Sequence, residues 1–229
     1  MSRDIPEIIA IDGPAASGKS TIGSRLADCW DYLYFDTGLM YRAVTWYILH
    51  QGTAVEDEDR VSTVAAEIDI DVRPPSVPDG RDYDVVVEGK DITWEIRSPQ
   101  VDAHVSEVAA YPGVRKALTV KQRQIGLRGE VVMVGRDIGT VVLPEAGLKI
   151  YLDASVEERA RRRYQQRIDR GEQVDYQDIL QVMEKRDEID STRDVAPLRV
   201  AEDAVVVDTE GMTIPEVVDH LAALARGGV

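Results

Sequence analysis

Five short apolar runs alternate with longer amphipathic segments along the chain. The runs contain few polar residues, which is typical of strands in a parallel sheet that is covered on both faces. They lie at residues 7–12, 32–36, 130–134, 148–153 and 204–208. Helical patterns fall between them, at residues 20–30, 38–51, 111–128, 155–170 and 214–226. The alternation predicts a doubly wound α/β fold with a five-stranded parallel sheet, helices on both faces, and ligands at the carboxyl edge of the strands.

One stretch, residues 68–96, departs from this rhythm. It contains three short segments of alternating polarity, IDIDV, DYDVVVEG and KDITWEI, and a proline-rich loop separates the first two. Gly89-Lys90 is interpreted as the tight turn of a hairpin between the second and third segments. We expect residues 65–100 to form a small antiparallel insertion on the α/β core. The acidic run at residues 56–59 is interpreted as a solvated helix start.

Composition excludes several classes of protein. No apolar run approaches the roughly 18 residues of a membrane helix, and residues 1–6 have no signal-peptide core. One cysteine and three scattered histidines exclude an intrachain disulfide and a cysteine or histidine zinc site. The net charge of −15 argues against binding to a nucleic-acid polymer. We expect a cytoplasmic monomer that binds neither membranes nor nucleic acids.

Positive charge is concentrated in residues 155–170, which contain six arginines and three acids. Ser155 and Glu158 have the spacing of a capping box. Arg159, Arg163 and Arg167 follow at intervals of four, so they share one helix face and repel each other unless an anion bridges them. A second helix is expected to begin near residue 175. This pair of helices is interpreted as a lid over an anionic ligand, and the alternative is a solvated helix whose arginines pair with nearby acids.

A phosphate-binding motif, G-x-x-x-x-G-K-[ST], lies between the first apolar run and the first helix. It comprises Gly13, Pro14, Ala15, Ala16, Ser17, Gly18, Lys19 and Ser20, and Thr21 comes next. The glycines let backbone N–H groups point at phosphate oxygens, to which the helix N-terminus adds partial positive charge. Lys19, taken to face solvent, would reach the β and γ phosphates of ATP, and the Ser20 hydroxyl would bind Mg²⁺. The guanine-reading motif N-K-x-D is absent, so a small-molecule kinase is favoured.

Three further motifs occur in a characteristic order. They are DTGLMYR at residues 36–42, GRDIGT at 135–140 and RDEIDSTR at 186–193, with KIYLDAS at 149–155. With the phosphate loop, they resemble the bacterial cytidylate kinases, the (d)CMP kinases among the P-loop nucleoside monophosphate kinases, over nearly the whole chain. The resemblance implies ATP·Mg²⁺ as donor and CMP or dCMP as acceptor. It also implies a core (1–64, 101–154 and 188–229), an acceptor-binding insertion (65–100) and a lid (155–187).

The resemblance also assigns roles to residues. It implies phosphate contacts for Arg136, Arg186 and Arg193, and a place near the ribose for Asp190. It implies that Asp137, Ser106 and Arg115 contact the cytosine. Arg159 and Arg163 of the lid are expected to contact ATP. From the residues alone, a structural Arg136–Asp137 pair, a capping or surface Ser106 and a solvated face of Arg186, Asp190 and Arg193 remain open alternatives.

The segment after the second apolar run is placed at the ligand edge. Tyr41 and Arg42 open a helix there, where an arginine could hold the acceptor phosphate; the alternative is a surface Arg42 with Tyr41 in the core. Thr37 replaces the serine usual in the family, which keeps the hydroxyl and adds a methyl group near the sugar. Catalysis is expected from Lys19, Mg²⁺ and the arginines alone, because a phosphomonoester is already mostly a dianion at pH 7. Another P-loop kinase, acting on UMP, AMP or a non-nucleotide, and a non-catalytic ATP sensor are the rival functions.

Overall fold

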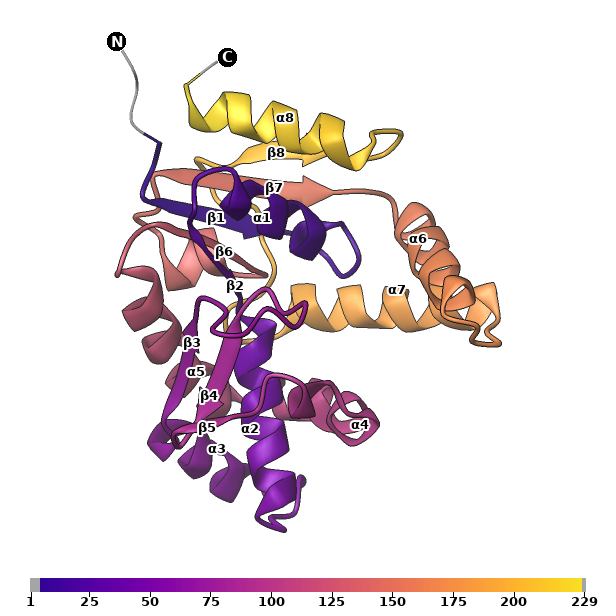
Figure 1. Ribbon diagram of the computed structural model, residues 1–229. Coiled ribbons are helices and arrows are strands. Elements are labelled where there is room, and N and C mark those ends of the chain that lie inside the picture. The colour runs from indigo at the N-terminus through magenta and orange to yellow at the C-terminus, as the bar shows by residue number, and fades with distance from the viewer. Residues whose placement is uncertain (1–4, 228–229) are drawn as a thin grey trace.

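The computed structural model describes residues 5–227. Its central sheet is parallel, with the strand order β2-β6-β1-β7-β8 (Figure 1). The strands are β1 (Ile8–Asp12), β2 (Leu33–Asp36), β6 (Val131–Gly135), β7 (Leu148–Asp153) and β8 (Val205–Asp208). The predicted five-stranded parallel sheet is therefore confirmed. Because β1 is central, the loop that follows it leaves the middle of the carboxyl edge.

Helices cover both faces of this sheet. On β6 the successive residues Met133 and Val134 point to opposite faces. A Cβ added at Gly23 of α1 (Lys19–Asp28) would lie 2.6 Å from Val134 Cγ1, and one at Gly126 of α5 (Pro112–Gly126) would lie 2.8 Å from Met133 Cε. Helices α1 and α5 thus pack closely on opposite faces, and α8 (Ile214–Ala225) packs beside α1. The doubly wound arrangement is confirmed.

A second, antiparallel sheet contains β3 (Ile70–Arg73), β4 (Asp84–Val87) and β5 (Lys90–Asp91). The predicted position of its hairpin turn was wrong by one residue. Val87 pairs with Lys90, so the turn is Glu88-Gly89, and both residues have positive φ, 50° and 77°. The predicted third strand was also too long, because the chain turns into a short 3₁₀ helix, η1 (Glu95–Arg97), soon after β5.

Three helices lie beside this small sheet (Figure 1): α2 (Gly38–His50), α3 (Glu58–Glu67) and α4 (Pro99–Val108). α3 packs on α5, and α4 packs on α2. The Asp57 side chain accepts the N–H of Arg60, which confirms the predicted helix start. Sequence analysis did not identify α4, although Ser98 caps it and Pro99 occupies its first turn, a pairing that favours a helix N-terminus.

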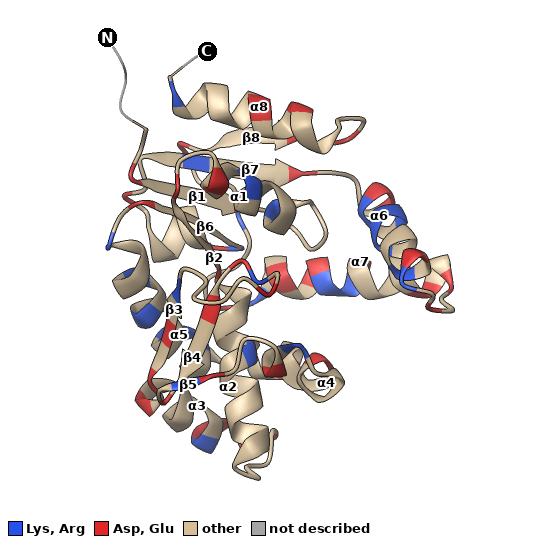
Figure 2. Cartoon of the chain, viewed as in Figure 1, with Lys and Arg blue, Asp and Glu red and all other residues tan. Residues whose placement is uncertain are grey.

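Two helices, α6 (Val156–Asp169) and α7 (Tyr176–Thr192), extend beside the sheet (Figure 1). They bury a small apolar cluster of their own, centred on Ala160, Ile179 and Met183. Charged residues cover much of α6 (Figure 2). The predicted capping box is only half formed: the Ser155 hydroxyl accepts the N–H of Glu158, but the Glu158 carboxylate pairs with arginines instead. Within residues 5–227, no helix is both long and apolar enough to cross a membrane.

Candidate active site

The phosphate loop joins β1 to α1 at the carboxyl edge of the sheet. Gly13 has φ 149°, and a Cβ there would lie 2.1 Å from the Leu152 carbonyl oxygen, so only glycine fits. Gly18, with φ 97°, forms the N-cap of α1. The first N–H groups of α1 therefore open onto the loop, with the geometry that binds phosphate oxygens.

Lys19 does not face solvent, so that expectation was wrong. Its side chain is buried with 6% of the residue exposed, and Nζ donates to the Pro14 carbonyl at 2.5 Å and to Ser17 Oγ at 3.2 Å. Burial lowers the pKa of Lys19 well below its usual value, and the positive charge of Arg136 lowers it further. The loop thus holds an ammonium group whose hydrogen-bond acceptors, among the residues described, are both neutral.

Ser20 and Asp36 place two oxygen ligands side by side. The Ser20 hydroxyl donates to Asp36 Oδ2 at 3.1 Å, and Asp36 Oδ1 accepts the N–H of Gly38. Between residues 5 and 227 no group of three or more His, Cys, Asp or Glu side chains could hold a metal. A hydroxyl and a single carboxylate nevertheless fit Mg²⁺, which keeps several waters and takes its other ligands from substrate phosphates.

Five of the predicted acceptor residues form one continuous charged network. Asp190 on α7 accepts Arg136 Nε at 2.9 Å and Arg193 at 3.1 Å. Arg193 NH2 lies 3.8 Å from Asp137 Oδ1, and Asp137 Oδ2 accepts Arg115 at 3.0 Å. The structure therefore brings together three segments of the chain: α5, the end of β6, 22 residues after Arg115, and the end of α7, 54 residues after Arg136.

Asp137 and Arg115 form the buried end of this network. Their side chains are only 8% and 4% exposed, and Arg115 also donates to the carbonyls of Val195 and Ala109. The Arg115 guanidinium lies over the Tyr41 ring, 5.4 Å from its centroid. Burial raises the pKa of the Asp137 carboxyl, although the charges of Arg115 and Arg193 oppose this. The Arg136–Asp137 pair that was the structural alternative is not formed: each residue pairs with another partner.

Arg193 is not on the helix face where the sequence placed it. α7 ends at Thr192, and Arg193 follows as the C-cap with extended backbone, φ −61° and ψ 145°. Its guanidinium nevertheless returns to Asp190, and Arg193 NH2 is buried without a hydrogen-bond partner. A buried, unpaired N–H group near Asp137 is suited to an additional oxygen ligand.

Arg186 is the free cation of the site. It forms no hydrogen bond or ion pair with any residue from 5 to 227, whereas Arg136 and Arg193 are both paired. The charges of Arg186 and Arg136 both act on Lys19. The charges of these three cations therefore repel one another, and the carboxylates of Asp36, Asp12 and Asp190 offset part of that repulsion.

Three further predicted acceptor residues, Arg42, Thr37 and Ser106, lie outside this network. Arg42 on α2 forms an ion pair with Asp102 of α4 at 2.7 Å and donates to the Ile96 carbonyl. The Thr37 hydroxyl is buried and donates to the Val134 carbonyl at 3.0 Å. Ser106 is exposed on α4 and joins no hydrogen bond among the described residues. The network around Asp190 thus includes neither Thr37 nor Ser106.

Two of the three lid arginines, Arg159 and Arg167, are paired with acids. Arg159 donates to Asp187 of α7 at 2.6 and 3.2 Å and to the carbonyl of Ala15 in the phosphate loop at 3.1 Å. Arg167 pairs with Glu172, and Arg163 bonds to Gln166. Arg159 and Arg167 are thus paired as the alternative of a solvated helix expects, whereas burial and the charges of Arg170 and Arg167 lower the pKa of Arg163, so repulsion persists there. Of the three, only Arg159 contacts the phosphate loop.

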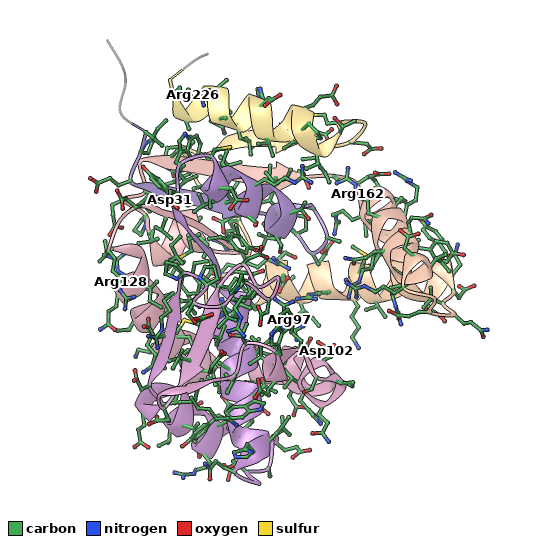
Figure 3. All side chains as sticks on the ribbon, in the orientation of Figure 1. Asp31, Arg97, Asp102, Arg128, Arg162 and Arg226 are labelled. Carbon is green, nitrogen blue, oxygen red and sulfur yellow. The ribbon has the colours of Figure 1, made fainter. Side chains whose placement is uncertain are left out.

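Three residues that link parts of the site were not predicted from the sequence: Arg162, Asp187 and Asp12. Arg162 donates to the hydroxyl and carbonyl of Thr209, which ties α6 to the loop after β8; Figure 3 labels it on α6 and labels Asp102 on α4. Asp187 holds Arg159 as described above. Asp12, the last residue of β1, is 4% exposed and accepts two backbone N–H groups beside Asp137. A charged residue that ends an otherwise apolar strand was the only signal for Asp12.

Comparison with known proteins decides the family. The model of the cytidylate kinase family matches residues 9–227. The chain belongs to the cytidylate kinase family. Curated cytidylate kinases from Herpetosiphon aurantiacus and Roseiflexus castenholzii are 48% and 49% identical to it, over 96% and 93% of this chain and 94% and 90% of theirs. The predicted resemblance is therefore confirmed, and with it the assignment as a nucleoside monophosphate kinase.

The fold is also found among solved structures. An uncharacterized protein from Eubacterium ventriosum superposes with a TM-score of 0.53, at 10% identity, over 95% of this chain and 97% of that one. At this identity the likeness concerns the fold alone. It agrees with the α/β architecture that the strand order establishes for this cytidylate kinase family member.

Proposed function

We propose that the protein transfers the γ-phosphoryl group of ATP to CMP or dCMP in a cage of cations, without a general base. The observation that carries this proposal is the convergence of Lys19, Arg136 and the unpaired Arg186 beside the Asp137 network. A protein that only sensed ATP would need the phosphate loop, but it would not need a second group of arginines next to it. The positive charges there would offset the repulsion between the phosphates of the donor and the acceptor.

The donor would lie on the phosphate loop. The backbone N–H groups at the start of α1 and the Lys19 ammonium would bind its phosphates once Lys19 leaves the Pro14 carbonyl. Ser20 and Asp36 would hold Mg²⁺, which neutralises charge on the β and γ phosphates when bound. Arg159, already in contact with the loop at Ala15, would reach ATP from the lid formed by residues 155–187.

The acceptor would lie between the end of β6 and α2. Arg42, Arg186 and Arg193 would hold its phosphate, and Arg136 would lie between the two phosphate groups. Asp137, kept in place by Arg115, would accept from the exocyclic amine of cytosine. We assign the ribose side to Asp190 and Thr37, and a further base contact to Ser106 on α4. Residues 65–100 would act as the insertion that covers the acceptor.

No side chain needs to remove a proton in this scheme. The acceptor phosphate has a second pKa of about 6 and already carries its attacking oxygen as an anion at pH 7. At an effective dielectric near 20, two like charges about 4 Å apart repel by about 4 kcal/mol. The cations offset this repulsion and hold the groups in line, so catalysis rests on positioning and electrostatics.

A panel of acceptors tests the proposal. ADP release is measured with CMP, dCMP, UMP, AMP and shikimate, and CDP is detected in a single turnover. We expect CMP and dCMP to be preferred, Lys19→Ala to lower turnover by orders of magnitude, and Asp137→Asn to narrow the preference for CMP over UMP. A better reaction with UMP, AMP or shikimate would refute the assignment of the acceptor, and ATP binding without CDP formation would refute catalysis.

A further inference from the structure

Asp12 links the donor side of the site to the acceptor side. It is the last residue of β1, it pairs in register with Gly135 of β6, and Gly13 of the phosphate loop follows it directly. Its two carboxylate oxygens accept backbone N–H groups from the other side: Ile138 N–H at 2.8 Å and Gly139 N–H at 2.7 Å. Those two residues immediately follow Arg136 and Asp137. One side chain thus connects two segments that are 126 residues apart in sequence.

The Asp12 carboxylate packs closely against the backbone at Gly139. A Cβ at Gly139 would lie 3.3 Å from Asp12 Oδ2 and 3.1 Å from Lys149 Cδ, so the carboxylate and the backbone approach closely. The Lys149 ammonium is committed to both oxygens of Asp203 at 2.8 Å, and it does not pair with Asp12. The hydrogen bonds that Asp12 forms are therefore both to the backbone of the segment it holds.

Burial of a charged carboxylate at this position costs free energy of desolvation. Burial raises the pKa of Asp12 to about 6 despite the two N–H groups, and the negative charge of Asp137 raises it as well. An apolar side chain would fill the space without a desolvation penalty. What an apolar side chain could not do is fix two successive N–H groups, because hydrogen bonds to a charged acceptor are directional and stronger than those to a neutral one.

We propose that Asp12 is a positioning residue for recognition of the acceptor base. It fixes residues 138 and 139 against the start of the phosphate loop, and so sets the position of the Asp137 carboxylate relative to the bound donor. This inference rests on the proposed function, in which Asp137 reads the cytosine amine. Asp12 itself touches neither substrate.

Asp12→Asn tests the inference with a nearly unchanged shape. An amide can accept only one of the two N–H groups and turns its own NH₂ donors toward the other. We expect kcat/KM for CMP to fall about 10- to 100-fold, as for a misplacement of about 1 Å, and UMP to be affected less, so that the CMP-over-UMP ratio narrows. Glu216→Gln is the matched control: Glu216 on α8 accepts Thr213 N–H at 2.8 Å, and the same carboxylate-to-amide change there should leave the ratio unaltered.

A double-mutant cycle with Asp137→Asn separates positioning from general stability. If Asp12 acts through Asp137, its effect on the CMP-over-UMP ratio disappears in the Asp137→Asn background. Gly139→Ala approaches the same contact from the backbone side and should also narrow the ratio, which keeps the test valid if Asp12→Asn does not fold. An unchanged ratio in both folded variants, or fully additive effects in the cycle, would overturn the inference while leaving the proposed function intact. A wild-type protein that does not prefer CMP would instead overturn the proposed function, and this inference with it.

Discussion

The buried ammonium of Lys19 predicts that this residue destabilises the ligand-free protein. The substitution that tests this is Lys19→Met, which keeps the length of the side chain and removes the charge. Lys19 Nζ has two neutral oxygen acceptors, Pro14 O and Ser17 Oγ; burial and the charge of Arg136 disfavour its ammonium form, and the charges of Asp36 and Asp12 only partly compensate. Bound ATP would instead stabilise the ammonium form of Lys19, because the phosphate oxygens would place negative charge beside it.

The magnitude follows from two opposing terms. Replacement of a buried ion pair by apolar residues of similar volume is often neutral or stabilising by about 1–4 kcal/mol, and we take the same range for the buried ammonium of Lys19. Against this, the carbonyl of Pro14 loses its donor, at a cost of about 1–3 kcal/mol when no water replaces it. We expect a net gain of about 1 kcal/mol in the free energy of unfolding for Lys19→Met, or a rise of about 2–4 °C in Tm for a chain of this size.

The sign of the pH dependence provides a second readout. The pKa of Lys19 is lowered on folding, so the folded protein binds fewer protons than the unfolded chain between the lowered value and 10.5. The stability of the wild type therefore rises with pH through that window, and the advantage of Lys19→Met shrinks as pH approaches 10. The difference in stability between wild type and Lys19→Met at each pH reports the titration of Lys19, because all other groups titrate in both proteins.

Thermal and denaturant unfolding at pH 7 and pH 10, with and without ATP·Mg²⁺, measure these effects. The matched control is Lys121→Met, since Lys121 Nζ also donates to a backbone carbonyl, that of Ile68 at 2.8 Å, but lies outside the site. We expect the control to lose stability and to keep its stabilisation by ATP. A Lys19→Met protein less stable than wild type by 1 kcal/mol or more, or one still stabilised by ATP as strongly as wild type, would refute the reasoning.

Three further predictions concern the acceptor, the lid and the packing of α1. Arg42→Ala should raise the KM for CMP about tenfold or more, the equivalent of one charged hydrogen bond, and leave ATP affinity unchanged; a loss confined to ATP binding would place Arg42 in the donor site. Amide hydrogen exchange in residues 155–180 should slow with a bisubstrate analogue and change little with CMP alone, and equal exchange in all states would exclude a lid. Gly23→Ala places a Cβ 2.6 Å from Val134 Cγ1 and should cost about 1–3 kcal/mol despite the better helix propensity of alanine. The cost should fall in a Val134→Ala background, where the contact with Tyr34 Cε2 at 3.2 Å remains; an unchanged cost in denaturant titrations of the double variant would disprove the clash with Val134.

Helices, strands and the phosphate loop could be predicted from the sequence because each is encoded by residues that are close together in the chain. The phosphate motif, the apolar strands and the cap at Asp57 each depend on residues within a few positions of one another. The hairpin was misplaced for the same reason. Glycine marks the turn correctly, but the turn also requires φ 50° at Glu88, and glutamate gives no sign that it adopts such a conformation.

The side-chain partners could not be predicted in this way. Lys19 was expected to face solvent because it lies in a loop motif, but its ammonium turns back onto the loop carbonyl of Pro14. The contact of Asp12 with residue 138 and that of Arg115 with Asp137 depend on which strands and helices meet in space. Tertiary packing decides such contacts, and a spacing rule applies only within one element.

The division of the site into paired and unpaired cations explains how an acidic protein can hold two anions. Asp190 and Asp137 fix the guanidinium groups of Arg136, Arg193 and Arg115 before any ligand arrives, so less side-chain entropy is lost on binding. These carboxylates also cancel part of the positive charge that would otherwise destabilise the fold. Among residues 5–227 Arg186 forms no ion pair and Lys19 bonds only to neutral acceptors, so nearby carboxylates compensate the charges of these two cations only in part. In the proposed function, the paired arginines would therefore set the geometry, and Lys19 and Arg186 would supply much of the attraction for the phosphates.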